Sequence, residues 1–319
     1  MWQYVQTAPS TFELRDAPAP DASDVREGEL LLEFQAGSIC GSDIPKFRGE
    51  LDPDNPYTGE PGVPLHELVA RVWESRAEGF ARGDRVVGIV AESRGLAEFI
   101  VNPAEFVHRI DNALSDIEAT VIQPVATVLS AYSRVRGLGG RRVAVLGLGS
   151  LGILFAKIAK DLGAAHVTGV DRVDRRGLDA SFGLDQMAVT NTRSWARSLI
   201  EEDRADLVVD AIGHRQEILA DAVTATARGG EVLMFGLPED NYVFPMREFF
   251  RKGLSLSGGT TQDWPKYLRE AEEYVIANRV LQEEYITHIF SVDRIQDGFE
   301  LYSTPRENRL KVAITASGR

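Results

Sequence analysis

Short apolar runs separated by glycine, proline and charged residues dominate the first third of the chain. This pattern predicts strands over 29–37, 68–75, 84–90 and 95–103, because runs of this length rich in β-branched residues fit a pleated, half-buried surface. Several short strands with turns between them indicate a β-rich, barrel-like domain. Four prolines and three glycines fall within 48–64, so we expect a long loop there.

The pattern changes to a helical period over 114–136, where apolar residues repeat on one face. Beyond it, apolar strands alternate with helical segments, which is typical of a parallel doubly wound sheet. Strands are expected at 141–146, 205–213, 230–237 and 253–259, with another ending at Asp171. The tail is expected to form helices at 264–278 and 293–303 and strands at 286–292 and 310–315. The predicted fold class is therefore α/β.

The composition narrows the classes of function. Apolar residues make up 44% and charged residues 26%, which is ordinary for a globular protein. The chain carries 35 basic and 48 acidic residues, a net charge of −13, which disfavours nucleic acid and anionic membranes as partners. A single cysteine excludes an intramolecular disulfide framework and fits a reducing compartment. The start lacks a signal-peptide pattern and no apolar run reaches membrane-spanning length, so we expect a cytoplasmic protein.

The strongest local motif is a glycine-rich turn between a strand and a helix. Gly147, Gly149 and Gly152 form G-x-G-x-x-G directly after an apolar strand, where they allow a tight turn and the close approach of a pyrophosphate to a helix N-terminus. Asp171 ends the next strand, 19 residues after the last glycine, where a carboxylate binds the ribose hydroxyls of NAD. The motif with its full context predicts a dinucleotide site.

Basic residues after Asp171 complicate the choice of cofactor. The carboxylate would repel a 2′-phosphate, so NAD is favoured over NADP, but Arg172, Arg175 and Arg176 offer charge for that phosphate or form a solvated turn. The candidate cofactor-binding residues are Gly147, Gly149, Ser150, Leu151, Gly152, Asp171, Arg172 and Arg176.

The one cysteine belongs to a second candidate site. Cys40, His66 and Glu67 offer the sulfur, nitrogen and oxygen donors that zinc accepts. Their spacing does not demand a metal, because a lone cysteine is commonly a core residue and a lone histidine a structural one. From the residue types alone, both interpretations remain open.

Several motifs together resemble the medium-chain zinc-dependent alcohol and polyol dehydrogenases, especially the sorbitol, threonine and glucose dehydrogenase branch. The similar segments are ICGSD, LHELVA, GDRVV, QPVATVLSAY, GLGSLG, VVDAIG and GEVLMFGLP, in that order along nearly the whole chain. The resemblance implies a GroES-like β-rich catalytic domain over 1–123, a Rossmann NAD-binding domain over 124–262, and a C-terminal segment over 263–319 that completes the catalytic domain.

The resemblance also implies the metal site. The family's ligands fall on Cys40, His66 and Glu67, and its fourth position, often glutamate, falls on Gln123. The family's four-cysteine lobe is absent here, so we expect one catalytic zinc and no structural zinc. Ser42 is placed to accept the alcohol proton, but Pro45 stands where a relay histidine is common in the polyol branch.

The implied reaction is hydride transfer between NAD and a secondary alcohol or ketone of a sugar, polyol or cyclitol, phosphorylated and amino-substituted forms included. A phosphate or acidic substrate would need local basic residues, and the candidates are Lys46, Arg48, Arg247, Arg251 and Lys252, which are otherwise surface charges. A homodimer or homotetramer is expected, since the segment 253–259 resembles the family's edge strand that pairs across a dimer.

Two alternative functions remain open: a zinc-free NAD(P)H-dependent reductase of the same superfamily and a non-catalytic dinucleotide-binding sensor.

Overall fold

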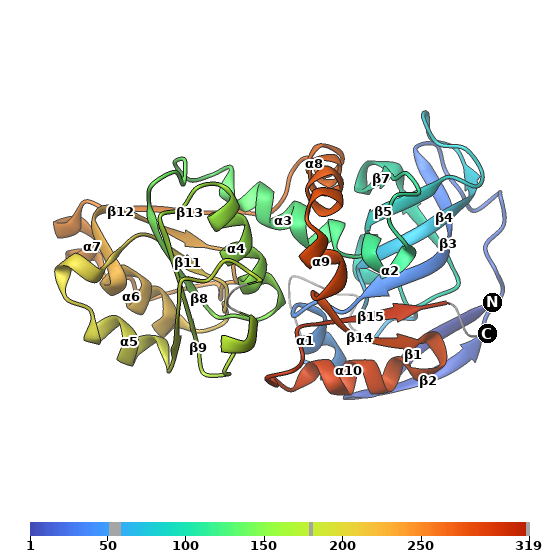
Figure 1. Ribbon diagram of the computed structural model, residues 1–319. Helices are drawn as coiled ribbons and strands as arrows, with labels where there is room; N and C mark the ends of the chain where they lie inside the picture. The colour runs from blue at the N-terminus through green and yellow to red at the C-terminus, as the bar shows by residue number, and fades with distance from the viewer. Residues whose placement is uncertain (51–58, 179–180, 317–319) are drawn as a thin grey trace. The chain divides into compact units, whose positions relative to one another are not determined.

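The computed structural model describes residues 1–50, 59–178 and 181–316. The chain packs into two compact units, which are described separately (Figure 1). Unit 1 comprises residues 1–126 and 262–319, and unit 2 comprises residues 127–261. Residues 51–58 of the predicted loop at 48–64 lie outside the described residues.

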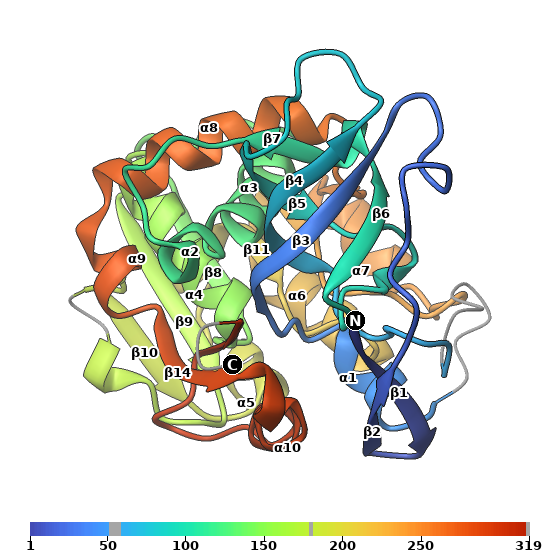
Figure 2. The same ribbon diagram turned by 90° about the vertical axis from the view of Figure 1, so that its right-hand side faces the viewer.

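Unit 1 is built on an antiparallel-rich sheet and a separate hairpin. Its described strands are β1 (Trp2–Ala8), β2 (Thr11–Asp16), β3 (Glu29–Ser38), β4 (Glu67–Ser75), β5 (Arg85–Ile89), β6 (Phe99–Pro103), β7 (Val107–Arg109), β14 (Ile286–Ser291) and β15 (Lys311–Thr315). The sheet has the order β14-β15-β3-β4-β5-β7, with β6 pairing β3, and β1 pairs β2 separately. Figure 2 shows the long strands β3 and β4 side by side.

The strands β3 and β4 carry runs of buried apolar residues that contribute to the core of unit 1. In β3 and β4 the apolar side chains form one core with residues from β1, β15 and α10, and Leu30, Leu32 and Leu68 are almost fully buried in it. The helices whose residues lie wholly in unit 1 are α1 (Asp43–Phe47), α2 (Asp116–Ala119), α8 (Trp264–Ala277), α9 (Arg279–Glu283) and α10 (Ile295–Ser303). The helix α3 (Ile122–Tyr132) contains the boundary between the two units.

Unit 2 is a parallel sheet with helical crossovers. Its described strands are β8 (Arg142–Leu146), β9 (His166–Asp171), β10 (Gln186–Val189), β11 (Ala205–Asp210), β12 (Thr226–Met234) and β13 (Ser255–Gly258), and its α-helices are α4 (Ser150–Asp161), α5 (Thr192–Ser198), α6 (Gln216–Ala225) and α7 (Met246–Lys252). The strand order β10-β9-β8-β11-β12-β13 is that of a Rossmann sheet. The predicted α/β class, with one β-rich part and one parallel sheet, is confirmed.

The structure differs from the sequence-based prediction in several elements. The predicted helix at 114–136 is two helices, because Ser115 and Glu118 form a capping box that starts α2 separately. The predicted strand at 95–103 begins only at Phe99, since the backbone of Gly95 and Leu96 bonds the segment 62–65 instead. The hairpin of β1 and β2 was not predicted, because its second strand is mostly charged and exposed.

A buried lysine stabilises the end of a helix in unit 2. Lys252 is 8% exposed, and its Nζ donates to the carbonyl oxygens of Val223 and Thr224 at 2.8 Å and of Thr226 at 3.0 Å. These carbonyls lie at the C-terminal end of α6, where a helix lacks internal donors and attracts positive charge. The side chain therefore caps the C-terminal end of α6.

The substitution Lys252→Met should destabilise the protein by about 1–3 kcal/mol, because it leaves buried carbonyls without a donor. Urea unfolding measures the loss. Arg251→Met, which removes an exposed charge from the same helix, is the matched control and should change stability little. Equal midpoints for Lys252→Met and the unmodified protein would contradict the capping role.

Candidate metal and dinucleotide sites

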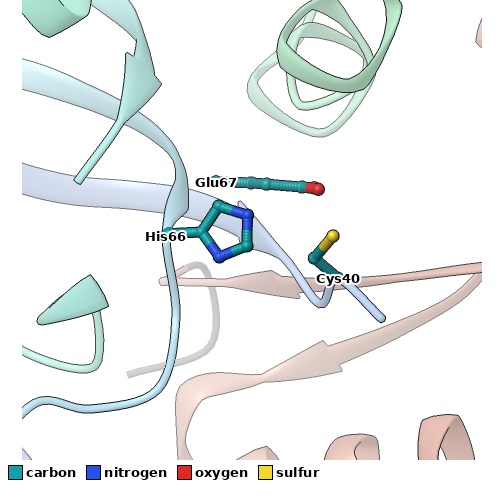
Figure 3. Close-up of side chains that lie close together, drawn as sticks. All are labelled: Cys40, His66 and Glu67. Atoms are coloured by element: carbon teal, nitrogen blue, oxygen red, sulfur yellow. The ribbon is translucent and has the colours of Figure 1, made fainter. Parts of the chain in front are cut away.

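Three potential metal ligands meet at the end of two paired strands. Ligand atoms of Cys40, His66 and Glu67 all lie within 4.8 Å of one another, and all three side chains are buried (Figure 3). Antiparallel pairing of β3 with β4 sets Ser38 opposite Glu67. Cys40, two residues beyond the end of β3, therefore faces the start of β4, and a separation of 26 residues in sequence closes to contact distance.

An aspartate fixes the orientation of the histidine. Asp43 Oδ1 lies 2.7 Å from His66 Nδ1, and its Oδ2 accepts a hydrogen bond from the backbone N–H of Cys40 at 2.9 Å. Because Nδ1 is engaged, Nε2 is the nitrogen left for a metal. Although burial disfavours the imidazolium, Asp43 and Cys40 together raise the pKa of His66 well above its usual value. Asp43 thus supports the site without being a ligand.

Glu67 is bound by other residues of the protein. Lys311 Nζ lies 2.8 Å from Oε1 and 2.6 Å from Oε2 of Glu67, and the hydroxyl of Ser38 donates to Oε2. Lys311 is fully buried and Glu67 is 1% exposed. Although burial disfavours the ammonium, Glu67 raises the pKa of Lys311 above its ordinary value. In this arrangement, the carboxylate of Glu67 is held by a cation and a hydroxyl.

The donor set fits zinc. One thiol, one imidazole nitrogen and one carboxylate within mutual reach are the ligand types that zinc binds in tetrahedral sites. In such sites the ligand histidine commonly donates the hydrogen on its other ring nitrogen to a carboxylate, as His66 can to Asp43. Cys40 is the one cysteine of the sequence, so the chain has no set of four cysteines for a second zinc.

Three further residues that the sequence singled out, Ser42, Pro45 and Gln123, lie in unit 1. Ser42 immediately precedes α1, and its hydroxyl makes no capping hydrogen bond to that helix. Gln123 lies in the first turn of α3 and is 4% exposed. Pro45 lies inside α1.

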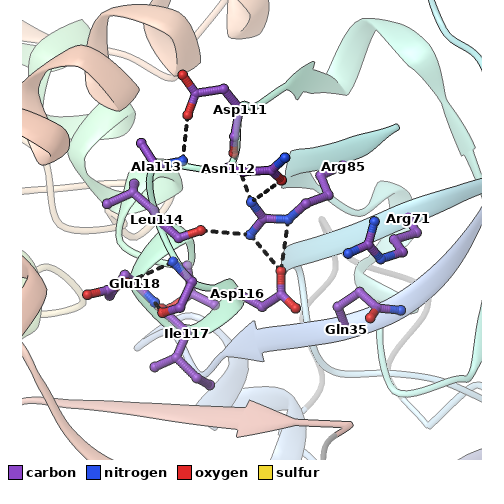
Figure 4. Close-up of polar contacts among 12 residues, drawn as sticks. Gln35, Arg71, Arg85, Asp111, Asn112, Ala113, Leu114, Asp116, Ile117 and Glu118 are labelled. Carbon is purple, nitrogen blue, oxygen red and sulfur yellow. Dashed lines mark hydrogen bonds and ion pairs between the residues drawn. The ribbon is translucent and has the colours of Figure 1, made fainter. Parts of the chain in front are cut away.

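A buried arginine holds the segment that leads to Gln123. Arg85 on β5 donates to Asp116 Oδ1 at 2.6 Å and to the carbonyl oxygens of Asp111 at 2.8 Å and Leu114 at 3.0 Å (Figure 4). These contacts tie the start of α2 to the sheet. The segment between β7 and α3 is therefore anchored to the same sheet that carries His66 and Glu67.

The glycine-rich turn has the backbone that its sequence predicts. Gly147 has a φ of +89°, and a Cβ at Gly152 would lie 1.8 Å from the carbonyl oxygen of Gly147, so both positions require glycine. The helix α4 begins at Ser150, with Gly149 as its N-cap, and includes Leu151. Gly149 has no side chain to cap this helix, so the backbone N–H groups of its first turn are the groups to which an anion would bind.

Asp171 lies against this turn. Its Oδ2 accepts from the backbone N–H of Leu148 at 2.6 Å and its Oδ1 from that of Val173 at 2.8 Å. Arg176 pairs with Asp174, with Nε 3.0 Å from each carboxylate oxygen, and this contact lowers the pKa of Asp174 to about 2. Arg172 is exposed. The structure thus brings Asp171 to the glycines, while Arg176 is engaged by its own loop.

Sequence reasoning missed Lys311 as part of the metal region. The available signal was a lone lysine in the otherwise apolar strand LKVAIT, where an uncompensated charge would be costly.

Of the other predicted basic residues, Arg48 is exposed and donates to the carbonyl of Ser303 at 3.0 Å, and Arg247 and Arg251 belong to unit 2. Among the described helices, none combines the length and apolarity needed to cross a bilayer.

Comparisons with known proteins agree with these features. Residues 26–112 match the family described as alcohol dehydrogenase GroES-like domain, and residues 150–273 match the family described as zinc-binding dehydrogenase. A sorbitol dehydrogenase of Bombyx mori is 25% identical over 323 residues, covering 89% of this chain and 90% of the relative. An L-threonine 3-dehydrogenase of Alteromonas mediterranea is 26% identical over 334 residues, covering 90% and 92%.

A solved structure shares the fold. The alcohol dehydrogenase TADH from Thermus sp. ATN1 superposes with a TM-score of 0.83 at 22% identity, covering 99% of both chains. The match to residues 26–112 contains the metal-ligand trio, and the match to residues 150–273 begins within the glycine-rich turn. The chain therefore belongs to the medium-chain zinc-type alcohol dehydrogenase superfamily and is an oxidoreductase.

Proposed function

We propose that this protein transfers hydride between NAD and a secondary alcohol or ketone of a sugar, polyol or cyclitol. The observation that carries the proposal is the buried trio of Cys40, His66 and Glu67, in a chain with a glycine-rich dinucleotide turn. We assign unit 1 as the catalytic part and unit 2 as the NAD-binding part. Family membership and the named activities of the sorbitol and threonine dehydrogenase relatives support this assignment.

The metal ligands in this proposal are Cys40 as thiolate, His66 through Nε2, and Glu67 and Gln123 as the exchangeable pair. Zinc bound there would supply Lewis acidity that lowers the pKa of a substrate alcohol. Asp43 holds the imidazole in the orientation that leaves Nε2 available. Ser42 would accept the alcohol proton and pass it to solvent, and NAD held at the glycine-rich turn would supply the acceptor for the hydride.

Lys311 sets the condition under which Glu67 can serve as a ligand. The carboxylate must leave a buried ammonium and the hydroxyl of Ser38, so ligation by Glu67 competes with an ion pair in an apolar core. This supports an exchangeable role for Glu67 rather than a permanent one. Cys40 and His66 are then the permanent ligands.

NAD is the proposed cofactor, with NADP less favoured. Asp171 lies at the glycine turn and would repel a 2′-phosphate. Arg176, a candidate for binding that phosphate, is paired with Asp174. We also propose a homodimer or homotetramer formed through β13, which is the edge strand of the unit 2 sheet and carries Leu256 with 40% of its surface exposed.

The zinc assignment predicts that the purified protein binds about one zinc per chain, as a single-site enzyme does. Cys40→Ser and His66→Asn should each lose most of the metal and the alcohol oxidation. His288→Asn, which changes a histidine elsewhere in unit 1, should keep the metal. Mass-spectrometric metal analysis measures the content.

Other outcomes of this measurement would support the alternative functions. Absence of zinc together with tight NADPH binding would support the zinc-free reductase. Binding of NAD without turnover of any polyol would support the dinucleotide sensor. Full alcohol oxidation by Cys40→Ser would reject the zinc mechanism.

The pairing of Lys311 with Glu67 predicts that Lys311→Met destabilises the protein by about 3–5 kcal/mol, because it leaves a buried carboxylate without its cation. Added zinc should raise the melting temperature of this variant more than that of the unmodified protein, because Glu67 regains a cation. Lys311→Arg keeps the charge and is the control. An equal response to zinc in all three proteins would show that Glu67 is not a ligand.

The cofactor assignment predicts that Asp171→Ser shifts the ratio of NADPH to NADH dissociation constants by about tenfold or more towards NADPH, since one charged hydrogen-bonding group is removed. Fluorescence titration of both reduced cofactors measures the ratio. Glu202→Gln removes an exposed charge from the same unit and should leave the ratio unchanged. A ratio that Asp171→Ser does not move would contradict the role of Asp171.

A further inference from the structure

A second buried lysine in unit 1 has no carboxylate partner among the described residues. Lys46 lies on α1 and is 6% exposed. Its Nζ donates to the hydroxyl of Ser93 at 2.9 Å. An ammonium has three donors, and a neutral hydroxyl satisfies one of them without compensating the charge.

The nearby carboxylates of the described residues are already engaged. Asp43, three residues earlier on α1, is close enough to be stabilised by the charge of Lys46, but its two oxygens are bonded to His66 and to the backbone of Cys40 rather than to the ammonium. Glu92, next to Ser93, pairs with Arg94 through Nε at 2.9 Å, and both of these side chains are exposed. A buried cation without a paired anion is costly, so a function is the expected reason for retaining it.

Both ends of the contact between Lys46 and Ser93 are joined to the metal-ligand segments. The helix that carries Lys46 begins three residues after Cys40. The loop that carries Ser93 bonds the other ligand segment, because the carbonyl of Ser93 accepts from Leu65 N–H at 2.9 Å and the N–H of Val90 donates to the carbonyl of His66 at 2.8 Å. The ammonium therefore lies in the framework that carries Cys40 and His66.

The backbone at Ser93 is unusual. Glu92 and Ser93 have φ values of +57° and +58°, a left-handed conformation that side-chain-bearing residues adopt at a cost. Two such residues in succession are the pattern of a type I′ turn, closed here by the N–H of Arg94 and the carbonyl of Ala91, and such turns ordinarily use glycine, asparagine or aspartate. The conformation presents the Ser93 hydroxyl to Lys46.

We propose that Lys46 and Ser93 bind an anionic group, phosphate or carboxylate, on the alcohol substrate, so that the enzyme acts on acidic or phosphorylated sugar or polyol derivatives. This inference rests on the proposed dehydrogenase function and adds the substrate class. A protein with a net charge of −13 repels anions, so such a substrate needs a local cation close to the reacting centre.

The other basic residues considered for this role are less suitable. Arg48 is exposed and bonds the carbonyl of Ser303, and Lys252 caps α6. Of these candidates, Lys46 is the one that is both buried and connected to the ligand segments, and the other buried lysine of unit 1, Lys311, is paired with Glu67. A compact ammonium with a neighbouring hydroxyl suits a single anionic group, whereas arginine would favour planar, two-point recognition.

The first test compares three six-carbon alcohols with the zinc-loaded enzyme and NAD: sorbitol, sorbitol 6-phosphate and gluconate. The unmodified enzyme should have a higher kcat/KM for one of the two anions than for sorbitol, and the preferred anion identifies the group. Lys46→Met should lower the anion-to-sorbitol ratio by about tenfold or more, as the loss of a charged hydrogen bond does. Arg48→Gln, which removes an exposed charge two residues away, should leave the ratio and the basal activity unchanged.

The second test uses inorganic phosphate as a probe and does not depend on turnover. Calorimetry should show phosphate binding to the unmodified protein, weaker binding to Ser93→Ala, and loss of binding in Lys46→Met. Lys46→Arg keeps the charge and should retain part of the binding, which covers the case that Lys46→Met fails to fold.

Each result decides one of the two claims. An unchanged ratio or unchanged phosphate binding in the Lys46 variants overturns the anion site, and so does a preference of the unmodified enzyme for sorbitol over both anions. Phosphate binding that depends on Lys46, in a protein that oxidises no alcohol, supports the anion site and rejects the proposed dehydrogenase function.

Discussion

The pairing of β3 with β4 is the constraint on which the candidate metal site depends. Ser38 stands opposite Glu67 in this ladder, and the next residues of the two segments bring Cys40 and His66 together. A slip of one residue would turn every side chain to the other face. The buried leucines of both strands set the register, so the hydrophobic core determines the geometry of a polar site.

The polar groups at the end of these strands are held by a few buried charges. Asp43 orients His66, Lys311 holds Glu67, and Lys46 contacts Ser93. Buried ionic groups of this kind contribute little net stability, because desolvation offsets their attraction. Their presence in an otherwise apolar region is therefore better explained by the chemistry of the site than by folding. The two lysines differ in their partners. Lys311 is paired with the carboxylate of Glu67, whereas Lys46 forms no ion pair with a carboxylate among the described residues.

Local features of the fold and cofactor site could be predicted from the sequence. The glycine-rich turn and Asp171 belong to a single strand–helix–strand segment, so their spacing in the sequence is enough to predict that they lie close together. The members of the trio lie up to 27 positions apart in the sequence, and its metal-binding role was predicted only through resemblance to a family. Lys311 could not be assigned to Glu67, because 244 residues separate them and no periodicity links such distant positions. The hairpin of β1 and β2 was missed because β2 has only two apolar residues and is mostly exposed.

The central claim is that a zinc ion bound to this protein is ligated by the thiolate of Cys40 and the imidazole of His66. X-ray absorption spectroscopy of the zinc-loaded protein tests the claim directly, because sulfur scatterers are distinguished from nitrogen and oxygen. We expect one sulfur at about 2.3 Å, with the remaining ligands nitrogen or oxygen at about 2.0–2.2 Å. A first shell of nitrogen and oxygen alone would contradict the account, since it would place the metal away from the only cysteine in the chain.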